Sequence, residues 1–273
     1  MIKNQGNWEL NDKIIFALKD ISISFGGLQA VADCSFEIRD GEIFSLIGPN
    51  GAGKTTIFNI INALYKPDSG RVLLEGEDLV SLKPYQIAKR GIARTFQNIE
   101  LFKGMTVLDN IKLGRHVFLK SGILSDMLYW GRTQREELKL RREIEEKIID
   151  LLEIQTIRKQ VVGTLPYGLQ KRVELARALA MQPQVLLLDE PMAGMNLEET
   201  EDMARFIINV NTMWDVSIIL VEHDMGVVMD ISDRVCVLEF GRKIAEGSPQ
   251  EIQENPQVIS AYLGEDEKAY SRL

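Results

Sequence analysis

The sequence is poor in the residues that bind metals or form disulfides. Only two cysteines and two histidines occur among its 273 residues. Cys34 and Cys236 lie far apart, in no metal-type spacing, and each sits in an apolar stretch that resembles a strand. We therefore expect two buried thiols and no disulfide framework. Unpaired thiols fit a reducing cytoplasm.

The sequence also lacks a long apolar run and an excess of basic charge. No run approaches the about 18 residues that span a bilayer, and the first residues lack the apolar core of a signal peptide. Any role at a membrane is therefore expected to come through a partner. The net charge is −8 and the pI about 5.1, which does not favour non-specific binding to nucleic acid. The length allows one large domain or two small ones.

A phosphate-binding motif is the strongest positive feature of the chain. Residues 48–55 read Gly-Pro-Asn-Gly-Ala-Gly-Lys-Thr and fit the P-loop pattern G-x-x-x-x-G-K-S/T. A short apolar strand pattern at residues 42–47 precedes the motif and a helical pattern from Ile57 follows it. This is the context that the motif requires, so a glycine-rich turn that matches by chance is disfavoured.

The chemistry of the motif predicts the roles of its residues. Glycines let several backbone N–H groups point at phosphate oxygens, and the start of the helix adds the positive end of its dipole. We expect Lys54 to reach the β- and γ-phosphates and the Thr55 hydroxyl to bind Mg²⁺. The residues expected to hold the nucleotide are Gly48, Pro49, Asn50, Gly51, Ala52, Gly53, Lys54, Thr55 and Thr56.

Further polar candidates follow strand patterns. The apolar run at 185–188 ends in Asp189 and Glu190. We expect Asp189 to hold Mg²⁺ through water, and Glu190 to orient or deprotonate an attacking water. His223 follows another buried strand pattern and could bind the γ-phosphate. The Gln97 amide could coordinate Mg²⁺ or position water, although most glutamines are merely solvated. His116 is expected to be structural.

A second candidate anion site lies before a strong helical pattern. Residues 165–170 read Leu-Pro-Tyr-Gly-Leu-Gln, and the helical pattern continues to about residue 180. Gly168 would lie at the N-terminus of this helix, where anions bind. A C-terminal glycine turn is the disfavoured alternative, because the helix follows the glycine.

The remaining pattern predicts an α/β protein. Strand patterns early in the chain predict a small antiparallel sheet beside a nucleotide-binding core, and helical periodicity predominates between residues 84 and 181. The apolar residues at 119–132 are either core or a partner contact. We expect a single domain over 1–273, with a core at 13–85 and 182–250, a helical subdomain at 86–181 and a C-terminal helical extension at 251–273.

The order and spacing of these motifs resemble the ATPase subunits of ABC transporters over nearly the whole chain. Within that family the chain looks most like the larger ATPase of branched-chain amino acid importers. The resemblance implies an ABC ATPase fold, in which a P-loop NTPase core carries an antiparallel β subdomain and an inserted helical subdomain. The stretches that carry the finer resemblance are 92–98, 105–111, 116–135, 193–196 and 261–264.

The resemblance also implies roles and partners. Gln97, Asp189 and Thr55 would serve Mg²⁺, Glu190 would be the catalytic base, and His223 the switch histidine. Phe25 would stack on adenine, with an ordinary strand core residue as an equally weighted alternative. Two ATPase subunits would close head to tail, with ATP between the P-loop of one and the Gly168 loop of the other. The pair would dock near Gln97 onto two integral membrane permease subunits, peripherally on the cytoplasmic face of the inner membrane. The implied partners include, indirectly, a substrate-binding protein, and no nucleic acid.

The signature loop departs from the family pattern. The family reads Leu-Ser-Gly-Gly-Gln, or Leu-Ser-Tyr-Gly-Gln in this branch, whereas residues 165–169 here are Leu-Pro-Tyr-Gly-Leu. Pro166 lacks the hydroxyl and the backbone N–H, and Leu169 replaces an amide. We hypothesise a heterodimer with unequal ATP sites; the alternative is a site adapted to proline, as in a homodimer.

Three other functions compete with that of an importer ATPase. One is a soluble or export-type ABC ATPase. A second is an ATP-gated clamp that barely hydrolyses, which Glu190 and His223 argue against. A third, a DNA-repair ATPase head, is disfavoured because no long heptad run interrupts the core. The sequence does not specify the transported solute, so branched-chain amino acids rest on family analogy and urea or other amides stay open.

Overall fold

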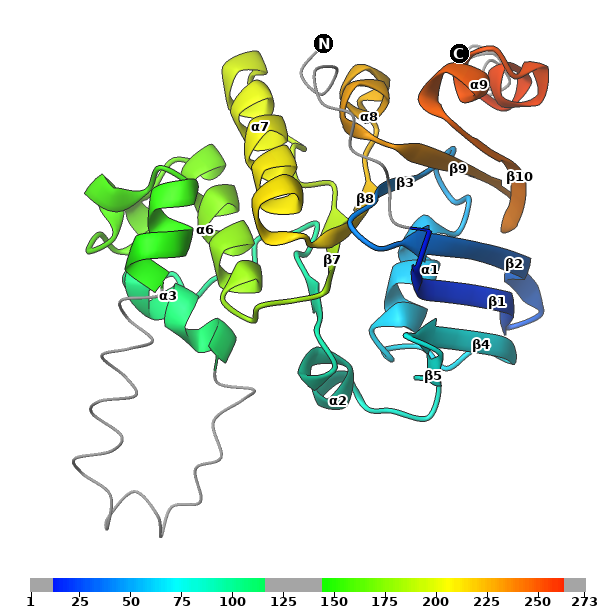
Figure 1. The fold of residues 1–273 in the computed structure, drawn as a ribbon, viewed down its shortest axis with the longest axis horizontal. Helices are drawn as coiled ribbons and strands as arrows, with labels where there is room; N and C mark the ends of the chain where they lie inside the picture. The colour runs from blue at the N-terminus through cyan, green and yellow to red at the C-terminus, as the bar shows by residue number, and fades with distance from the viewer. Residues whose placement is uncertain (1–11, 116–143, 263–273) are drawn as a thin grey trace, which may run out of the picture. The chain divides into compact units, whose positions relative to one another are not determined.

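The computed structural model describes residues 12–115 and 144–262 (Figure 1). Two units are distinguished: the first comprises the chain up to Arg94, Gln184–Glu190 and the chain from Ile207 on, and the second comprises Thr95–Pro183 and Pro191–Phe206. Within the described ranges, no helix is long and apolar enough to cross a membrane. His116, residues 119–132 and the last residues of the C-terminal extension, on which sequence predictions were made, lie outside the described residues.

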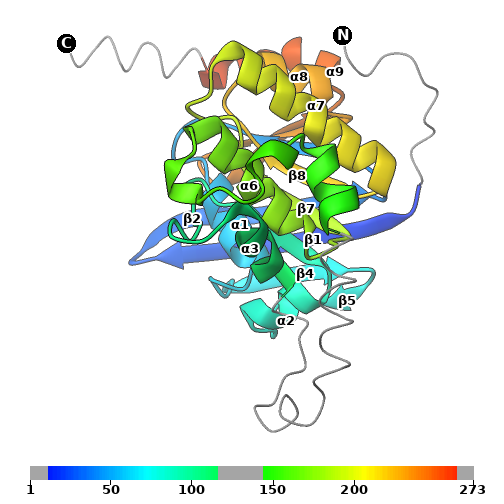
Figure 2. The same ribbon diagram turned by 90° about the vertical axis from the view of Figure 1, so that its left-hand side faces the viewer.

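The first unit contains a four-stranded antiparallel sheet. Its order is β2-β1-β4-β5, and the long β1–β2 hairpin crosses the view in Figure 2. Strand β1 continues through a shift in register between Leu18 and Ile21, where Asp20 has a φ of +53°. The strands are β1 (Ile14–Phe25), β2 (Leu28–Arg39), β4 (Ser69–Leu74) and β5 (Glu77–Asp78).

The second sheet of this unit is six-stranded, in the order β10-β9-β3-β8-β7-β6. All neighbours are parallel except the β9–β10 pair. Every residue of its central strands β3, β8 and β7 is buried, which explains their uninterrupted apolar sequences. The strands are β3 (Ile43–Ile47), β6 (Ile92–Arg94), β7 (Val185–Asp189), β8 (Ser217–Val221), β9 (Arg234–Glu239) and β10 (Arg242–Gly247).

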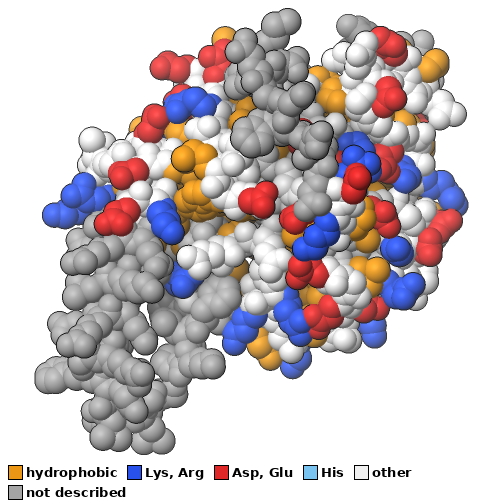
Figure 3. Space-filling model, in the orientation of Figure 1, with side chains coloured by type: hydrophobic (Ala, Val, Ile, Leu, Met, Phe, Trp, Pro, Cys, Tyr) orange, Lys and Arg blue, Asp and Glu red, His pale blue; other side chains and the backbone are white. Residues whose placement is uncertain are grey.

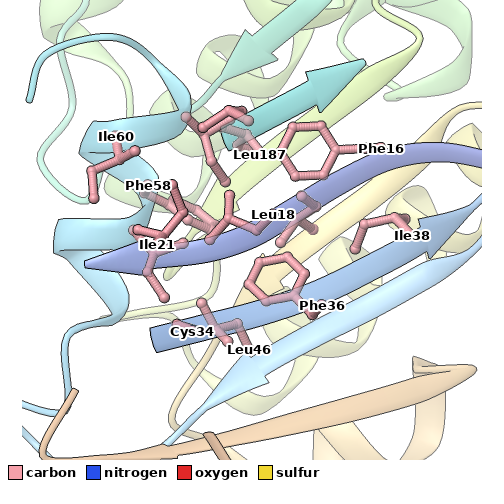
Figure 4. Packing of buried hydrophobic residues seen from close by; sticks show 14 of the residues in the cluster. Phe16, Leu18, Ile21, Cys34, Phe36, Ile38, Leu46, Phe58, Ile60 and Leu187 are labelled. Atoms are coloured by element: carbon pink, nitrogen blue, oxygen red, sulfur yellow. The ribbon is translucent and has the colours of Figure 1, made fainter. Parts of the chain in front are cut away.

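The main hydrophobic core of the first unit joins β1, β2, β3 and β7 to helix α1 (Lys54–Ile61) (Figure 4). Phe36 and Phe44 stack in it, with their ring centroids 5.1 Å apart. Cys34 and Cys236 belong to the same core as buried thiols, as the sequence predicts. Burial raises the pKa of the Cys34 thiol to about 12. The other helices assigned to this unit are α2 (Pro84–Lys89), α8 (Met225–Ile231) and α9 (Pro249–Gln253).

The second unit is built from helices. Helix α3 (Val107–Leu113) packs against α6 (Tyr167–Leu179), and the two lie side by side in Figures 1 and 2. The buried apolar residues of this unit include Ile144, Ile148 and Leu152. The shorter helices of this unit are η2 (Ile144–Ile149), η3 (Gln155–Ile157) and η4 (Val162–Thr164). Helix α7 (Leu197–Trp214) contributes residues to both units.

Candidate nucleotide-binding site

The P-loop joins β3 to α1 in the first unit. Gly48, Gly51 and Gly53 have φ values of +148°, +80° and +103°, which favour glycine. A Cβ on Gly48 would lie 2.1 Å from the Leu238 carbonyl oxygen, and one on Gly53 would lie 2.8 Å from the Ala30 carbonyl oxygen. Gly48 and Gly53 are therefore required by the close packing of the loop as well as by its curl, and Gly51 by the curl alone.

The Lys54 ammonium and the N-terminus of α1 make the loop suited to bind an anion. The Lys54 ammonium is buried and donates to the carbonyl oxygens of Gly48 and Pro49 at 2.5 and 3.0 Å. Helix α1 starts at Lys54 with no acidic residue in its first turn and no side chain capping its N–H groups. Thr55 is exposed at this helix end. An arriving phosphate would therefore meet the ammonium and the positive end of the helix dipole.

The strand order brings the other predicted residues of this unit to one sheet edge. Strands β3, β8 and β7 are neighbours and parallel, so their carboxyl ends lie at the same edge. The P-loop follows β3, His223 follows β8, and Asp189 and Glu190 lie at the end of β7. Ligands of open α/β sheets bind outside such carboxyl ends.

Glu190 and His223 contact each other. The Glu190 Oε1 atom lies 2.9 Å from His223 Nε2. Glu190 has a φ of +48°, an uncommon value outside glycine that is often found at functional sites. Its backbone N–H donates to the Val221 carbonyl at 2.8 Å, which fixes this conformation beside β8. The His223 backbone N–H in turn donates to the Glu222 carboxylate at 3.0 Å.

Asp189 is paired with a residue that sequence reasoning overlooked. Arg94 Nη2 lies 2.6 Å from Asp189 Oδ2, and the two side chains are 5% and 3% exposed. Arg94 Nη1 donates to Asn59 Oδ1 of α1 at 2.8 Å, and the guanidinium lies over the Phe58 ring. Arg94 thus links three segments around Asp189. No spacing in the sequence could have indicated this pair, since the partners are far apart along the chain.

Phe25 ends β1 and is 44% exposed, so it is not part of the buried core. Its ring makes an edge contact with the ring of Tyr65, with a centroid distance of 5.1 Å. A flat, partly exposed aromatic surface can accept a purine base. Tyr65 was not singled out from the sequence, because nothing local distinguishes it from an ordinary loop tyrosine.

Gln97 belongs to the second unit, in the irregular segment that runs from Thr95 to Phe102. Its carbonyl oxygen accepts a hydrogen bond from Lys171 Nζ at 2.8 Å. The first unit holds Lys54, Asp189, Glu190 and His223. A magnesium site that combines Gln97 with residues of the first unit stays a prediction.

The signature loop also lies in the second unit. Pro166 is the N-cap of α6 and provides no side-chain hydrogen bond. Gly168 is buried, and a Cβ there would come within 2.3 Å of Glu199 Oε1. The Glu199 carboxylate accepts from the Asn196 backbone N–H at 3.1 Å, and Asn196 Oδ1 accepts from the Glu199 N–H at 3.0 Å. A Cβ at Gly168 would therefore displace the end of the Glu199 side chain from this helix start.

Comparison with known proteins gives the class. A family model described as "ABC transporter" matches residues 31–193. A solved ATP-binding cassette of an ABC transporter, in its ADP conformation, has a TM-score of 0.80 and 29% identity over 92% of this chain and 99% of that chain. The chain belongs to the ABC transporter family and is one of its ATPases. The predicted fold class is confirmed.

The finer resemblance is also confirmed. A model described as "Branched-chain amino acid ATP-binding cassette transporter" matches residues 242–268. The high-affinity branched-chain amino acid transport ATP-binding protein LivG of Salmonella typhimurium is 44% identical over 254 residues, which are 92% of this chain and 98% of LivG. The corresponding protein BraF of Pseudomonas aeruginosa is 39% identical, with the same coverage of both chains. The chain is therefore similar to this branch over nearly its full length.

Proposed function

We propose that this chain energises the import of branched-chain amino acids, or of related small polar solutes, by hydrolysing ATP. The observation that carries the catalytic part is the Glu190–His223 contact at the edge where the P-loop also lies. The solute class is supported by the names of LivG and BraF and by the C-terminal match. These relatives do not favour the soluble or export-type alternative.

The proposed nucleotide site uses the P-loop residues 48–56. Lys54 and the glycine backbone would bind the phosphates, and Phe25 would stack on adenine. The oxygen donors predicted for Mg²⁺ are the Thr55 hydroxyl, the Asp189 carboxylate and the Gln97 amide, a set of hard ligands that suits this ion. The exposed Thr55 at the start of α1 fits this role. When bound, Mg²⁺ would neutralise charge on the phosphates.

Hydrolysis is proposed to follow from Glu190. Its carboxylate accepts a proton from the water whose oxygen bonds to the γ-phosphorus, while the bond between that phosphorus and the bridging oxygen of ADP breaks. His223, already in contact with Glu190, would hold this carboxylate and the γ-phosphate in place. Both residues are ordered by backbone hydrogen bonds to β8 and Glu222.

The proposed assembly contains a second ATPase subunit and two membrane permease subunits, on the cytoplasmic face of the membrane. The Gly168 loop would serve the ATP held by the partner subunit's P-loop. Because Pro166 lacks a hydroxyl and an N–H, the ATP site completed by this loop would be the weaker one in a heterodimer. A homodimer adapted to proline is the alternative. Loss of one preorganised donor can cost about 2.7–4 kcal/mol of transition-state stabilisation.

Purification from detergent-solubilised membranes tests the assembly. A tagged copy of the chain, expressed with its native partners, is expected to bring down hydrophobic permease subunits, and Lys54→Ala is expected to do the same while losing ATP binding. Recovery of the tagged chain from the cytosol alone would instead support the soluble alternative.

A further inference from the structure

Three side chains of α6 hold the backbone of the Gln97 segment. They are Lys171, Glu174 and Arg177, which are spaced three residues apart and so share one helix face. Lys171 Nζ donates to the carbonyls of Phe96 and Gln97 at 3.3 and 2.8 Å.

The other two side chains bind the same segment further along. Glu174 Oε1 accepts from the backbone N–H groups of Phe96 and Glu100 at 3.4 Å each. Arg177 Nη1 donates to the Glu100 carbonyl. An irregular segment has no ladder of its own to satisfy its backbone groups. Here α6 supplies those partners through its side chains.

Two of these charges are buried. The side chains of Lys171 and Glu174 are each 2% exposed, and Lys171 Nζ lies 3.9 Å from Glu174 Oε2. Burial raises the pKa of the Glu174 carboxyl, and Lys171 opposes that shift. Within the part of the chain that the structure describes, Glu174 Oε2 accepts no hydrogen bond. Such pairs add little stability, since well-packed apolar residues of similar volume often serve as well or better. Stability alone therefore does not account for them.

The same helix carries the signature loop. Helix α6 begins at Tyr167, so Gly168 lies in its first turn and the three side chains lie along the turns that follow. Since the helix is a stiff element, a backbone segment fixed to its side moves together with its N-terminus. The structure therefore ties the Gln97 segment mechanically to the signature loop within one unit.

We propose that Lys171 and Glu174 are positioning residues that transmit displacement of the Gln97 segment to the signature loop. The inference rests on the proposed function in one respect, because it takes the permease as the partner that displaces this segment. The signature loop then has two positions: one in which it can close on the partner subunit's ATP, and one in which it is withdrawn from that ATP. Lys171 and Glu174 influence which position the loop takes without touching the nucleotide.

A double variant separates this role from a purely structural one. Replacing both charges, as Lys171→Met with Glu174→Met, removes the contacts to the segment without leaving one buried charge alone. Glu174→Gln is the conservative variant, because its amide oxygen can still accept from Phe96 and Glu100, and Lys171 keeps its hydrogen bonds to the carbonyls of Phe96 and Gln97. Arg205→Met is the matched control: Arg205 pairs with Glu153 and Asp202 in the same unit, away from the Gln97 segment.

The first measurement is hydrogen exchange of the isolated full-length chain, which needs no permease. In the double variant the amides of Phe96 and Glu100 are expected to exchange about tenfold faster, the gain from losing a hydrogen bond, while the amides of α6 keep their protection. Glu174→Gln and Arg205→Met are expected to leave the segment protected. Unchanged exchange in the double variant would overturn the proposal, because the side chains would not be holding the segment.

The second measurement uses the assembled transporter in proteoliposomes and compares ATP hydrolysed per solute moved. The double variant is expected to raise the number of ATP molecules hydrolysed per solute about fivefold or more, in the usual range of coupling energies, while Glu174→Gln is expected to keep the parent value. A double variant with loosened exchange and unchanged coupling would overturn the proposal. A parent complex that hydrolyses ATP but moves no branched-chain amino acid would contradict the proposed function instead, and the exchange result would still judge the contacts themselves.

Discussion

Arg94 Nη2 lies 2.6 Å from Asp189 Oδ2, and neither side chain is more than 5% exposed. The pair joins the last residue of β6 to the last residue of β7, and the guanidinium also donates to Asn59 of α1. Asp189 is the residue proposed to serve Mg²⁺. Its carboxylate is therefore held in place from the side by a cation that itself contacts helix α1.

Removing the cation from this pair should destabilise the protein. Arg94→Met removes the buried cation beside the Asp189 carboxylate and is expected to lower the free energy of unfolding by about 3–5 kcal/mol. Arg94→Lys keeps the charge but loses the planar fork, and should lose less. Urea denaturation measures both.

Arg90 offers a matched control for Arg94. It pairs with Glu77 at the surface, so Arg90→Met should cost about 1 kcal/mol or less. An Arg94→Met protein as stable as Arg90→Met would show that the buried pair is not needed to compensate Asp189.

Pro166 gives a prediction in the opposite direction. The residue is the N-cap of α6 and offers no capping oxygen, so Pro166→Ser is expected to stabilise the helix by about 0.5–2 kcal/mol. If the Gly168 loop is the weaker half of an unequal site pair, the same variant should raise ATP turnover of the assembled complex. Higher stability without a gain in turnover would count against the unequal pair and favour a site adapted to proline.

A methyl group at Gly168 would displace the Glu199 side chain. A Cβ at this position would lie 2.3 Å from Glu199 Oε1 and 2.7 Å from its Cδ, so Gly168→Ala is expected to lower thermal stability modestly, by disturbing the hydrogen bond from the Asn196 N–H to the Glu199 carboxylate. Adding Glu199→Ala should recover part of the loss, because it removes the clashing carboxylate. Equal melting temperatures for Gly168→Ala and the parent would contradict this packing, whatever happens to activity.

The thiols predict a pH dependence. The pKa of Cys34 is about 12 in the folded chain, against 9.0 as its ordinary value. The folded state therefore keeps a proton that the unfolded state releases, so this contribution to stability is full below pH 9 and is lost as the pH rises towards 12. Cys34→Ala should make the alkaline loss of stability less steep than in the parent, as measured by urea denaturation under reducing conditions. If the free energy of unfolding fell equally steeply with pH in Cys34→Ala and in the parent, the pKa of Cys34 would be the same in the folded and unfolded states.

The parts of the site that the sequence predicted are those in which local chemistry and strand context coincide. The P-loop needs glycines, a lysine and a following helix in one short stretch, and Asp189-Glu190 ends an apolar run that can only be a buried strand. The order of the strands in the six-stranded sheet places Lys54, Glu190 and His223 at one edge. This order is known from the structure and could not be predicted from the sequence pattern.

The parts that the sequence missed depend on distant pairs or on very short elements. Strand β6 has three residues, too few to show alternation, and was hidden in a stretch that reads as helical. Arg94, Lys171 and Glu174 look like ordinary surface charges, because only tertiary packing buries them. The Gln97 segment has no pattern of its own, since its hydrogen-bond partners lie on a helix some 75 residues further along the chain.

Acidic and basic side chains are interspersed among the described residues on the face in Figure 3. Glu190 is the residue proposed to drive transport through ATP hydrolysis. The most direct measurement is uptake of labelled leucine into proteoliposomes that contain the assembled complex and Mg-ATP, with the parent chain or with Glu190→Gln. We expect ATP-dependent uptake with the parent, and with Glu190→Gln no sustained uptake although ATP still binds. Equal uptake by both complexes would contradict the proposed role of Glu190.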